Sequence, residues 1–220
     1  RTSRARPRGV RRTTLVPEEV GRRMALAGIV TAPGTWCLQA SLVDQASGAV
    51  VLVRAPACVR HRPPIELGWA GDIVVGSHYG LPPNGGRSQF AAVDHLLRAP
   101  DLMIGNYEGT LSTGGSSRCS GGPPCFIFQA PPERARNLRA AGFDVMNLAN
   151  NHGLDKGEDA RRQTVTTLAR YDMLAAGLPG RVTTVRVADT VVAIVGMSPY
   201  PGTTNMRSPA AIRELVHAAR

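Results

Sequence analysis

The chain of 220 residues lacks the features that mark several protein classes. No apolar run reaches the roughly 18 residues that a membrane-spanning helix requires, so we predict no span in these residues. Only 4 cysteines are present, too few for a disulfide-rich scaffold at this length, and their spacing matches no zinc motif. Charged residues make up 19% and hydrophobic residues 43%, which excludes a disordered polyelectrolyte and favours a globular protein with a sizeable core.

Lysine is almost absent, since Lys156 is the only one among 26 basic residues, and the formal net charge is +10. Clustered cations attract anionic partners, but a preference for arginine is also what a GC-rich genome produces. Aromatic residues are scarce, at 5%, and no nucleic-acid recognition motif accompanies the charge. We therefore expect no specific nucleic-acid binding. Two explanations of the positive charge stay open: mutational bias in a GC-rich genome, and contact with an anionic envelope polymer.

Two of the cysteines lie close together in a loop-forming stretch. Cys119 and Cys125 flank Ser120–Pro124, a segment rich in glycine and proline. Such a loop is short enough for one disulfide to close it in an oxidising compartment. Two free thiols fit the sequence equally well.

The proline pair Pro63–Pro64 marks a predicted boundary. Residues 1–63 are interpreted as an arginine-rich leader of uncertain order, with strands predicted at Thr35–Gln39 and Ala49–Arg54. Residues 64–220 are interpreted as the principal domain. Glycine and proline, at 24 and 17 residues, favour many turns there and disfavour an all-helical bundle.

Strands alternate with helices across residues 64–220. Ile65, Leu67 and Trp69 alternate with less apolar residues, which predicts a strand that carries Asp72 at its end. Further strands are predicted at Leu102–Ile104 and Phe143–Leu148, a hairpin at Arg181–Val187 and Val191–Val195, and helices at Ser88–Arg98, Glu133–Ala141, Glu158–Tyr171 and Pro209–Arg220. This alternation predicts an α/β fold.

Polar side chains follow three of the predicted strands, where each strand ends. In an open α/β sheet, ligands collect beyond the carboxyl ends of the strands. Carboxylate, amide and imidazole groups together suit Mn, Fe, Mg or Zn. Each residue alone also fits a turn or the start of a helix, but their joint placement favours a metal site. The candidate residues are Asp72, Asn106, Glu108, Asn150, Asn151, His152 and Asp155.

Several segments resemble the N-terminal motifs of the bacterial CapA family of capsule or poly-γ-glutamate synthesis proteins. They are Gly71–Gly76, Asn106–Glu108 and Asn147–Gly157, and the last contains the specific string Asn-Asn-His-x-x-Asp-x-Gly. Phe126–Pro131 is similar to the family segment that precedes this string, so the resemblance covers roughly residues 65 to 205. It implies a four-layer α-β-β-α sandwich of the calcineurin-like metallophosphoesterase type, with a two-metal centre at the sheet edge.

The resemblance also implies roles for individual residues. Asp72 is expected to bind the first metal, Glu108 to lie near or bridge both metals, and Asn151 to bind the second. His152 is expected to protonate the leaving-group oxygen or to steady the transferring phosphoryl group. Asn106, Asn150 and Asp155 are expected to orient the ligands, His152 or its loop.

Two histidines are not assigned to the metal centre. His78 does not stand at the Asp-x-His spacing of ordinary metallophosphoesterases and is expected in a loop, and His217 is expected on an amphipathic helix. The family's later histidine ligands would follow the region where this sequence stops. We therefore expect either the N-terminal portion of a longer protein, truncated at the C-terminus, or a degenerate member.

The leading functional hypothesis is a CapA-like protein of capsule or poly-γ-glutamate biosynthesis on the outer side of the bacterial envelope. It is expected to hydrolyse phosphoesters with the help of two divalent metal ions. The sequence does not distinguish among Mn, Fe, Mg and Zn. Expected partners are an anionic polymer or phosphoester substrate and a membrane synthase complex. The alternative is a non-catalytic polymer-binding or assembly subunit with an incomplete metal site.

Overall fold

The computed structural model describes residues 34–38, 41–43, 46–47, 50–53, 57–61, 64–77, 80–119 and 124–220. The chain divides into two units, Arg1–Pro63 and Pro64–Arg220, which are considered separately. The arginine-rich stretch before residue 34 and the loop predicted at His78 lie outside the described residues. Within the described part, no helix has the length and apolar character needed to cross a bilayer.

The first unit contains two antiparallel strand pairs. Strand β1 (Gly34–Leu38) pairs with β4 (Ala57–His61), and β2 (Ser41–Val43) pairs with β3 (Val50–Val53). Strands β1 and β3 confirm the two strands predicted here, within one residue at each end. The partners β2 and β4 were not predicted.

The second unit is built on a four-stranded parallel sheet with the order β10-β9-β6-β5. Its strands are β5 (Leu67–Ile73), β6 (Leu102–Tyr107), β9 (Val145–Asn147) and β10 (Leu174–Ala176). Helices α1 (Asp94–Leu97), α2 (Ala135–Ala141) and α3 (Gly157–Arg170) connect successive strands. A parallel sheet with helical crossovers confirms the predicted α/β class.

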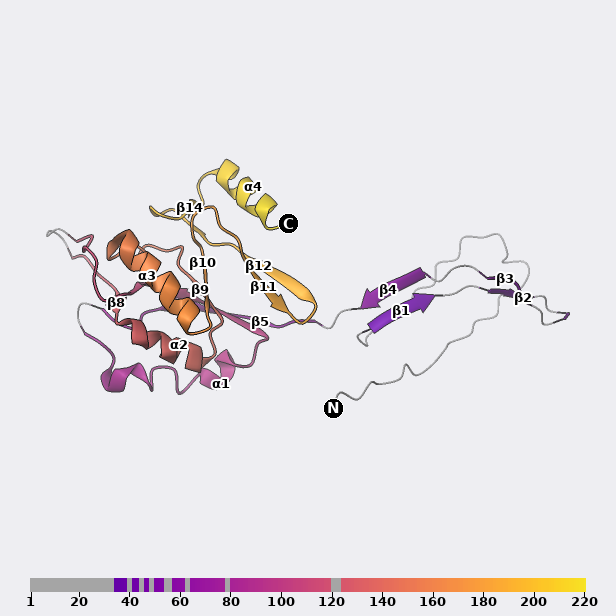
Figure 1. The fold of residues 1–220 in the computed structure, drawn as a ribbon, viewed down its shortest axis with the longest axis horizontal. Coiled ribbons are helices and arrows are strands. Elements are labelled where there is room, and N and C mark those ends of the chain that lie inside the picture. Colours follow the sequence, from indigo (N-terminus) through magenta and orange to yellow (C-terminus); the bar gives the residue numbers. More distant parts are fainter. Residues whose placement is uncertain are drawn as a thin grey trace. The chain divides into compact units, whose positions relative to one another are not determined.

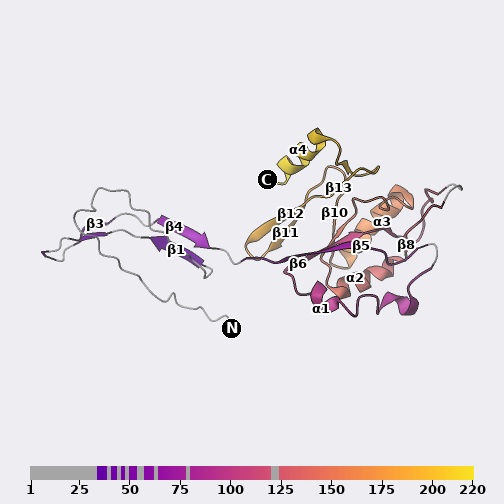
Figure 2. The ribbon, with the colours of Figure 1, turned by 180° about the vertical axis from the view of Figure 1, so that it is seen from behind.

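Further elements complete this unit (Figure 1). They are the 3-10 turns η2 (Pro83–Gly86) and η3 (Pro132–Arg134), the parallel pairs β7 (Thr110–Leu111) with β8 (Gln129–Ala130) and β13 (Met197–Ser198) with β14 (Thr204–Asn205), the hairpin β11 (Thr183–Val187) with β12 (Thr190–Ile194), and α4 (Pro209–Ala218). Figures 1 and 2 show α4 at the opposite end of this unit from α1. His217 is exposed on α4.

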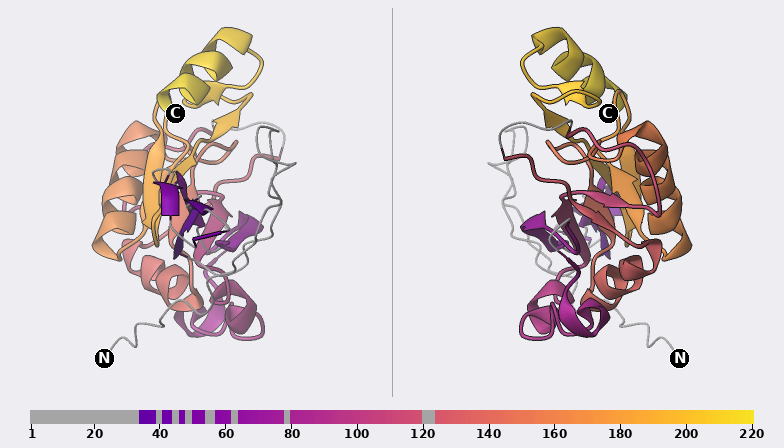
Figure 3. Two further views of the ribbon diagram at one scale, coloured as in Figure 1. Left: turned by 90° about the vertical axis from the view of Figure 1, so that its right-hand side faces the viewer. Right: turned by 90° about the vertical axis from the view of Figure 1, so that its left-hand side faces the viewer.

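Each face of the parallel sheet is covered by a different layer. On one face, α2 and α3 lie side by side (Figure 3) and bury Leu138 and Leu168 against the sheet. On the other face, the β11–β12 hairpin packs over Leu102, Ile104 and Val145. We name these the helix-side core and the hairpin-side core. Their separation follows from alternation, because neighbouring residues of a strand point to opposite faces.

One predicted helix is much shorter than expected. The apolar spacing within Ser88–Arg98 predicted a helix, but only Asp94–Leu97 is helical and the residues before it form turns. Tertiary contacts explain the difference. Phe90 packs edge-on against Phe143 with ring centroids 5.7 Å apart, and the side-chain amide of Gln89 donates to the carbonyl of Val74. These contacts hold the segment in turns that a continuous helix would not allow.

The helix-side core predicts that a buried and an exposed leucine contribute differently to the free energy of unfolding. Leu138 on α2 is 0% exposed and Leu96 on α1 is 61% exposed. We expect Leu138→Ala to lower the free energy of unfolding by about 2–5 kcal/mol, because it leaves a cavity in the helix-side core. Leu96→Ala is the matched control and should change it by less than about 0.5 kcal/mol. Urea unfolding followed by circular dichroism measures both, and equal losses would contradict this packing.

Candidate functional site

The carboxyl ends of β5, β6 and β9 bring three polar residues into one row. Asp72 is the partner of Asn106 in the β5–β6 register, and Asn106 is the partner of Asn147 in the β6–β9 register. The β5–β6 register shifts between Ala70 and Asp72, so Gly71 is an extra residue, as in a β-bulge. The shift turns Asp72 to the same face as Asn106.

The side-chain amide of Asn106 joins the row together. Its Nδ2 donates to Asp72 Oδ1 at 2.7 Å and to Glu108 Oε1 at 3.2 Å. Its Oδ1 accepts from Asn147 Nδ2 at 2.9 Å and from Asn150 Nδ2 at 3.0 Å. This amide therefore uses both of its donor hydrogens and both of its acceptor positions.

Glu108 follows β6 directly and is 7% exposed. Burial raises the pKa of its carboxyl group, and the negative charge of Asp72 raises it further. His152 and the hydrogen bond from Asn106 act in the opposite direction. Two carboxylates, one of them buried, therefore share a small volume in which a cation would relieve their repulsion.

The turn after β9 positions the next group of residues. Asn150 donates to the carbonyl of Tyr107 at 2.8 Å, and its Oδ1 accepts from the backbone N–H of His152 at 2.9 Å. Asn150 therefore links the end of β6 to the turn that carries His152. The imidazole Nε2 lies 3.6 Å from Glu108 Oε2, which places the ring beside that carboxylate.

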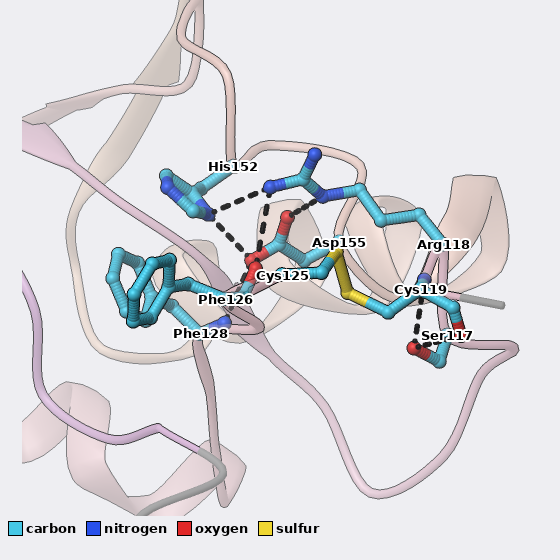
Figure 4. The surroundings of a disulfide bond; sticks show 8 residues. All are labelled: Ser117, Arg118, Cys119, Cys125, Phe126, Phe128, His152 and Asp155. Carbon is cyan, nitrogen blue, oxygen red and sulfur yellow. Dashed lines mark hydrogen bonds and ion pairs between the residues drawn. A yellow bond between two sulfur atoms is a disulfide. The ribbon is translucent and has the colours of Figure 1, made fainter. Parts of the chain in front are cut away.

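The other ring nitrogen of His152 contacts Asp155. His152 Nδ1 lies 2.7 Å from Asp155 Oδ2, and Asp155 is 0% exposed. Arg118 Nε donates to Asp155 Oδ1 at 2.5 Å, and the backbone N–H of Phe128 donates to Oδ2 at 2.7 Å. The Phe128 ring stacks on the imidazole with centroids 4.1 Å apart, and Figure 4 shows these residues beside the Cys119–Cys125 disulfide.

Asn151 differs from its neighbours because its side chain makes no hydrogen bond within the described part of the chain. It is half-buried, whereas Asp72 is exposed. No three His, Cys, Asp or Glu side chains among the described residues form a ready metal site. Nevertheless, the available donors are two carboxylates, a partner-free amide oxygen and an imidazole nitrogen, a set that suits hard or borderline divalent cations.

The structure brings six of the seven candidate residues into one interacting group at the carboxyl ends of β5, β6 and β9. Asp72, Asn106 and Glu108 interact directly with one another, Asn150 and His152 join them, and Asp155 lies behind His152. Asn151 stands beside His152 in the same turn. The metal-ligand and catalytic roles of these residues stay predictions.

Sequence reasoning missed Arg118, Phe128 and Asn147 as neighbours of the site. Asn147 lies within the motif string, and its position at the end of β9 was a usable signal. Arg118 precedes Cys119, and the structure resolves the two alternatives for that cysteine by bonding it to Cys125. No local sequence pattern indicates that Arg118 reaches Asp155, 37 residues further along the chain.

The geometry defines an α/β protein with a cluster of carboxylate, amide and imidazole groups at the carboxyl edge of a parallel sheet. Residues 66–212 match the family described as "Bacterial capsule synthesis protein PGA_cap". The match covers more than half of the chain, and the chain belongs to this family. The predicted resemblance is thereby confirmed at the level of the family.

Several curated proteins are similar to this chain. "Capsule biosynthesis protein CapA" of Bacillus anthracis is 24% identical over 159 residues, which are 71% of this chain and 36% of that protein. "PGA biosynthesis protein CapA" of Bacillus subtilis (strain 168) is 26% identical over 117 residues, 51% of this chain and 30% of that protein. "Uncharacterized protein y4sH" of Sinorhizobium fredii is 32% identical over 112 residues, 49% of this chain and 23% of that protein. The aligned parts thus amount to about a quarter to a third of these relatives.

The raised pKa of Glu108 predicts a pH-dependent cost in stability. The folded chain holds the Glu108 proton more tightly than the unfolded chain. Protonated Glu108 therefore favours the folded state, and this contribution to the free energy of unfolding is fully present below the ordinary carboxyl pKa and is lost as pH rises through the raised value. We expect Glu108→Gln to be more stable than the native chain at pH 7 in the presence of a chelator, and to approach it in stability near pH 4. Urea midpoints at both pH values measure this.

Glu66→Gln is the matched control, because Glu66 is exposed. It should show no such gain at pH 7. A Glu108→Gln chain that is less stable than the native chain at pH 7 would contradict the conclusion that burial and Asp72 destabilise the ionised Glu108 carboxylate.

Proposed function

We propose that this chain carries the N-terminal part of a metal-dependent phosphoester hydrolase that acts in capsule or poly-γ-glutamate biosynthesis. The observation that carries the proposal is the cluster around Asn106, where two carboxylates and an imidazole meet at the carboxyl edge of the sheet. The family match and the names of the two CapA relatives support the biosynthetic setting. We propose the outer side of the bacterial envelope as the place where the protein acts.

The proposed metal ligands are Asp72, Glu108 and Asn151. Two divalent cations, when bound, would polarise a phosphoester and lower the pKa of an attacking water. Glu108 stands between Asp72 and His152 in the network, which suits a carboxylate near both cations. The donor set accommodates Mn, Fe, Mg or Zn.

His152 is the proposed proton donor to the leaving-group oxygen. Asp155 occupies the Nδ1 side of the ring, so Nε2 is the nitrogen that faces Glu108 and would face a substrate there. An imidazolium proton held at Nε2 would pass to the departing oxygen, and the Asp155 carboxylate would stabilise the positive charge beforehand. Asn150 holds the backbone of His152 and so keeps this nitrogen in place.

The hydrolase proposal predicts large losses of activity from substitutions at the site. We expect the purified chain, or a longer chain that contains it, to hydrolyse bis(p-nitrophenyl) phosphate with added Mn²⁺ and to stop when EDTA is added. His152→Ala and Asn151→Ala should each lower the rate by about 100-fold or more. Arg139→Gln is the control, since its ion pair with Asp144 lies at the amino end of β9.

A second function is favoured by the net charge of +10, which suits contact with an anionic polymer. In that case the chain would be a non-catalytic polymer-binding or assembly subunit that works beside a membrane synthase. Absence of Mn²⁺-dependent hydrolysis, together with salt-sensitive retention on immobilised poly-γ-glutamate that survives His152→Ala, would support this function over the hydrolase.

We further propose that a second sheet completes a four-layer sandwich on the hairpin side. Leu67 and Trp69 of β5 are partners of Leu102 and Ile104, and therefore lie on the hairpin-side face. The hairpin covers Leu102 and Ile104 but leaves Leu67 and Trp69 exposed, at 52% and 61%. Large exposed apolar side chains on one sheet face are typical of a surface that another layer covers.

The sandwich proposal predicts a change in the environment of Trp69. In a Trp36→Phe background, Trp69 is the one remaining tryptophan of the chain. Acrylamide should quench its fluorescence readily in the 220-residue chain and far less in a longer natural chain that contains these residues. Equal quenching in both chains would count against a second sheet over β5.

A further inference from the structure

The buried carboxylate of Asp155 is held by two donors from one loop and by His152 from the turn after β9. Its oxygens accept from Arg118 Nε, from the backbone N–H of Phe128 and from His152 Nδ1. A fully buried carboxylate is stable only when it is paired and hydrogen-bonded. Arg118 supplies the positive charge, so this arginine is the counterion on which the position of Asp155 depends.

The disulfide joins the two sides of that loop. Arg118 directly precedes Cys119, and Phe126 directly follows Cys125. Arg118 Nη2 also donates to the carbonyl of Phe126 at 3.2 Å, so the guanidinium bridges both sides (Figure 4). Closing the loop covalently lowers the entropic cost of placing Arg118 and Phe128 at the same carboxylate.

This arrangement determines which nitrogen of His152 carries a proton. Asp155 Oδ2 is an acceptor, so the 2.7 Å contact assigns a hydrogen to His152 Nδ1. Arg118 Nη2 lies 3.4 Å from the same nitrogen. A guanidinium nitrogen cannot accept a hydrogen bond, so it does not compete with Asp155 for the Nδ1 hydrogen. In the neutral ring Nε2 is then unprotonated, and it is the nitrogen that points to Glu108.

We propose that Arg118 and the Cys119–Cys125 disulfide are positioning elements for His152. Arg118 neutralises and orients Asp155, Asp155 holds the His152 Nδ1 proton, and Phe128 stacks on the ring from the same loop. Arg118 does not touch the carboxylate pair of the site and acts through Asp155. This role rests on the proposed function, because His152 is the proton donor there.

The test observes the His152 ring without metal or substrate. In protein labelled with ¹⁵N-histidine, a hydrogen-bonded Nδ1–H gives a downfield proton resonance, and His152→Gln identifies it among the 5 histidines. We expect this resonance in the native chain and its loss in Arg118→Gln and in the double variant Cys119→Ser/Cys125→Ser. Arg139→Gln, which removes an ion pair elsewhere, should retain it.

Survival of the resonance in Arg118→Gln, with a native-like backbone amide spectrum, would overturn the proposal. If the double serine variant does not fold, Arg118→Gln decides alone because it leaves the disulfide intact. The result is separate from hydrolysis. A native chain without Mn²⁺-dependent activity but with the expected loss of the resonance would refute the hydrolase and leave the positioning of His152 supported.

Discussion

The four hydrogen bonds of one amide, that of Asn106, hold the site together. Its NH₂ group faces two carboxylates and its oxygen faces two other amide NH₂ groups, an orientation that the reverse assignment of oxygen and nitrogen could not satisfy. An aspartate here could not donate to Asp72 or Glu108 and would add a third negative charge. Asn106 thus allows two acidic side chains to stand close together without direct contact, while it ties β5 and β6 to the turn after β9.

Much of the fold follows from local patterns in the sequence. Period-two alternation and short apolar runs located β5, β6 and β9, and the helical pattern before Tyr171 located α3. The prediction of a helix over the whole of Ser88–Arg98 was wrong, because the long-range contacts of Phe90 and Gln89 outweigh the helical spacing of the apolar residues. The site residues could be predicted because they lie at or after the carboxyl ends of strands. Strict alternation would nevertheless place Asp72 with Ala70 on the helix side, and only the register shift at Gly71 moves it beside Asn106.

Two kinds of scaffold meet at His152. The carboxylate side of the site stands on parallel strands, whose register is set by backbone hydrogen bonds and by the two cores. The Asp155 side depends on a loop that is closed by the Cys119–Cys125 disulfide and by the hydrogen bond from Arg118 to the Phe126 carbonyl. The same loop contacts Asp155 through Arg118 and His152 through the Phe128 ring. Sequence patterns reveal the first kind because strands are periodic. They do not reveal the second, since contacts between Arg118 and Asp155 depend on tertiary structure alone.

The register shift at Gly71 also affects the outer edge of the sheet. Within the described residues, β5 is an edge strand that pairs with β6 alone. An edge strand with an unbroken row of N–H and C=O groups invites strands of other molecules to pair with it, and an extra residue interrupts that row. A Cβ at Gly71 would meet no atom within 4 Å, so the extra residue stands clear of its surroundings. The irregularity that turns Asp72 toward Asn106 therefore also opposes intermolecular strand addition at the carboxyl end of β5.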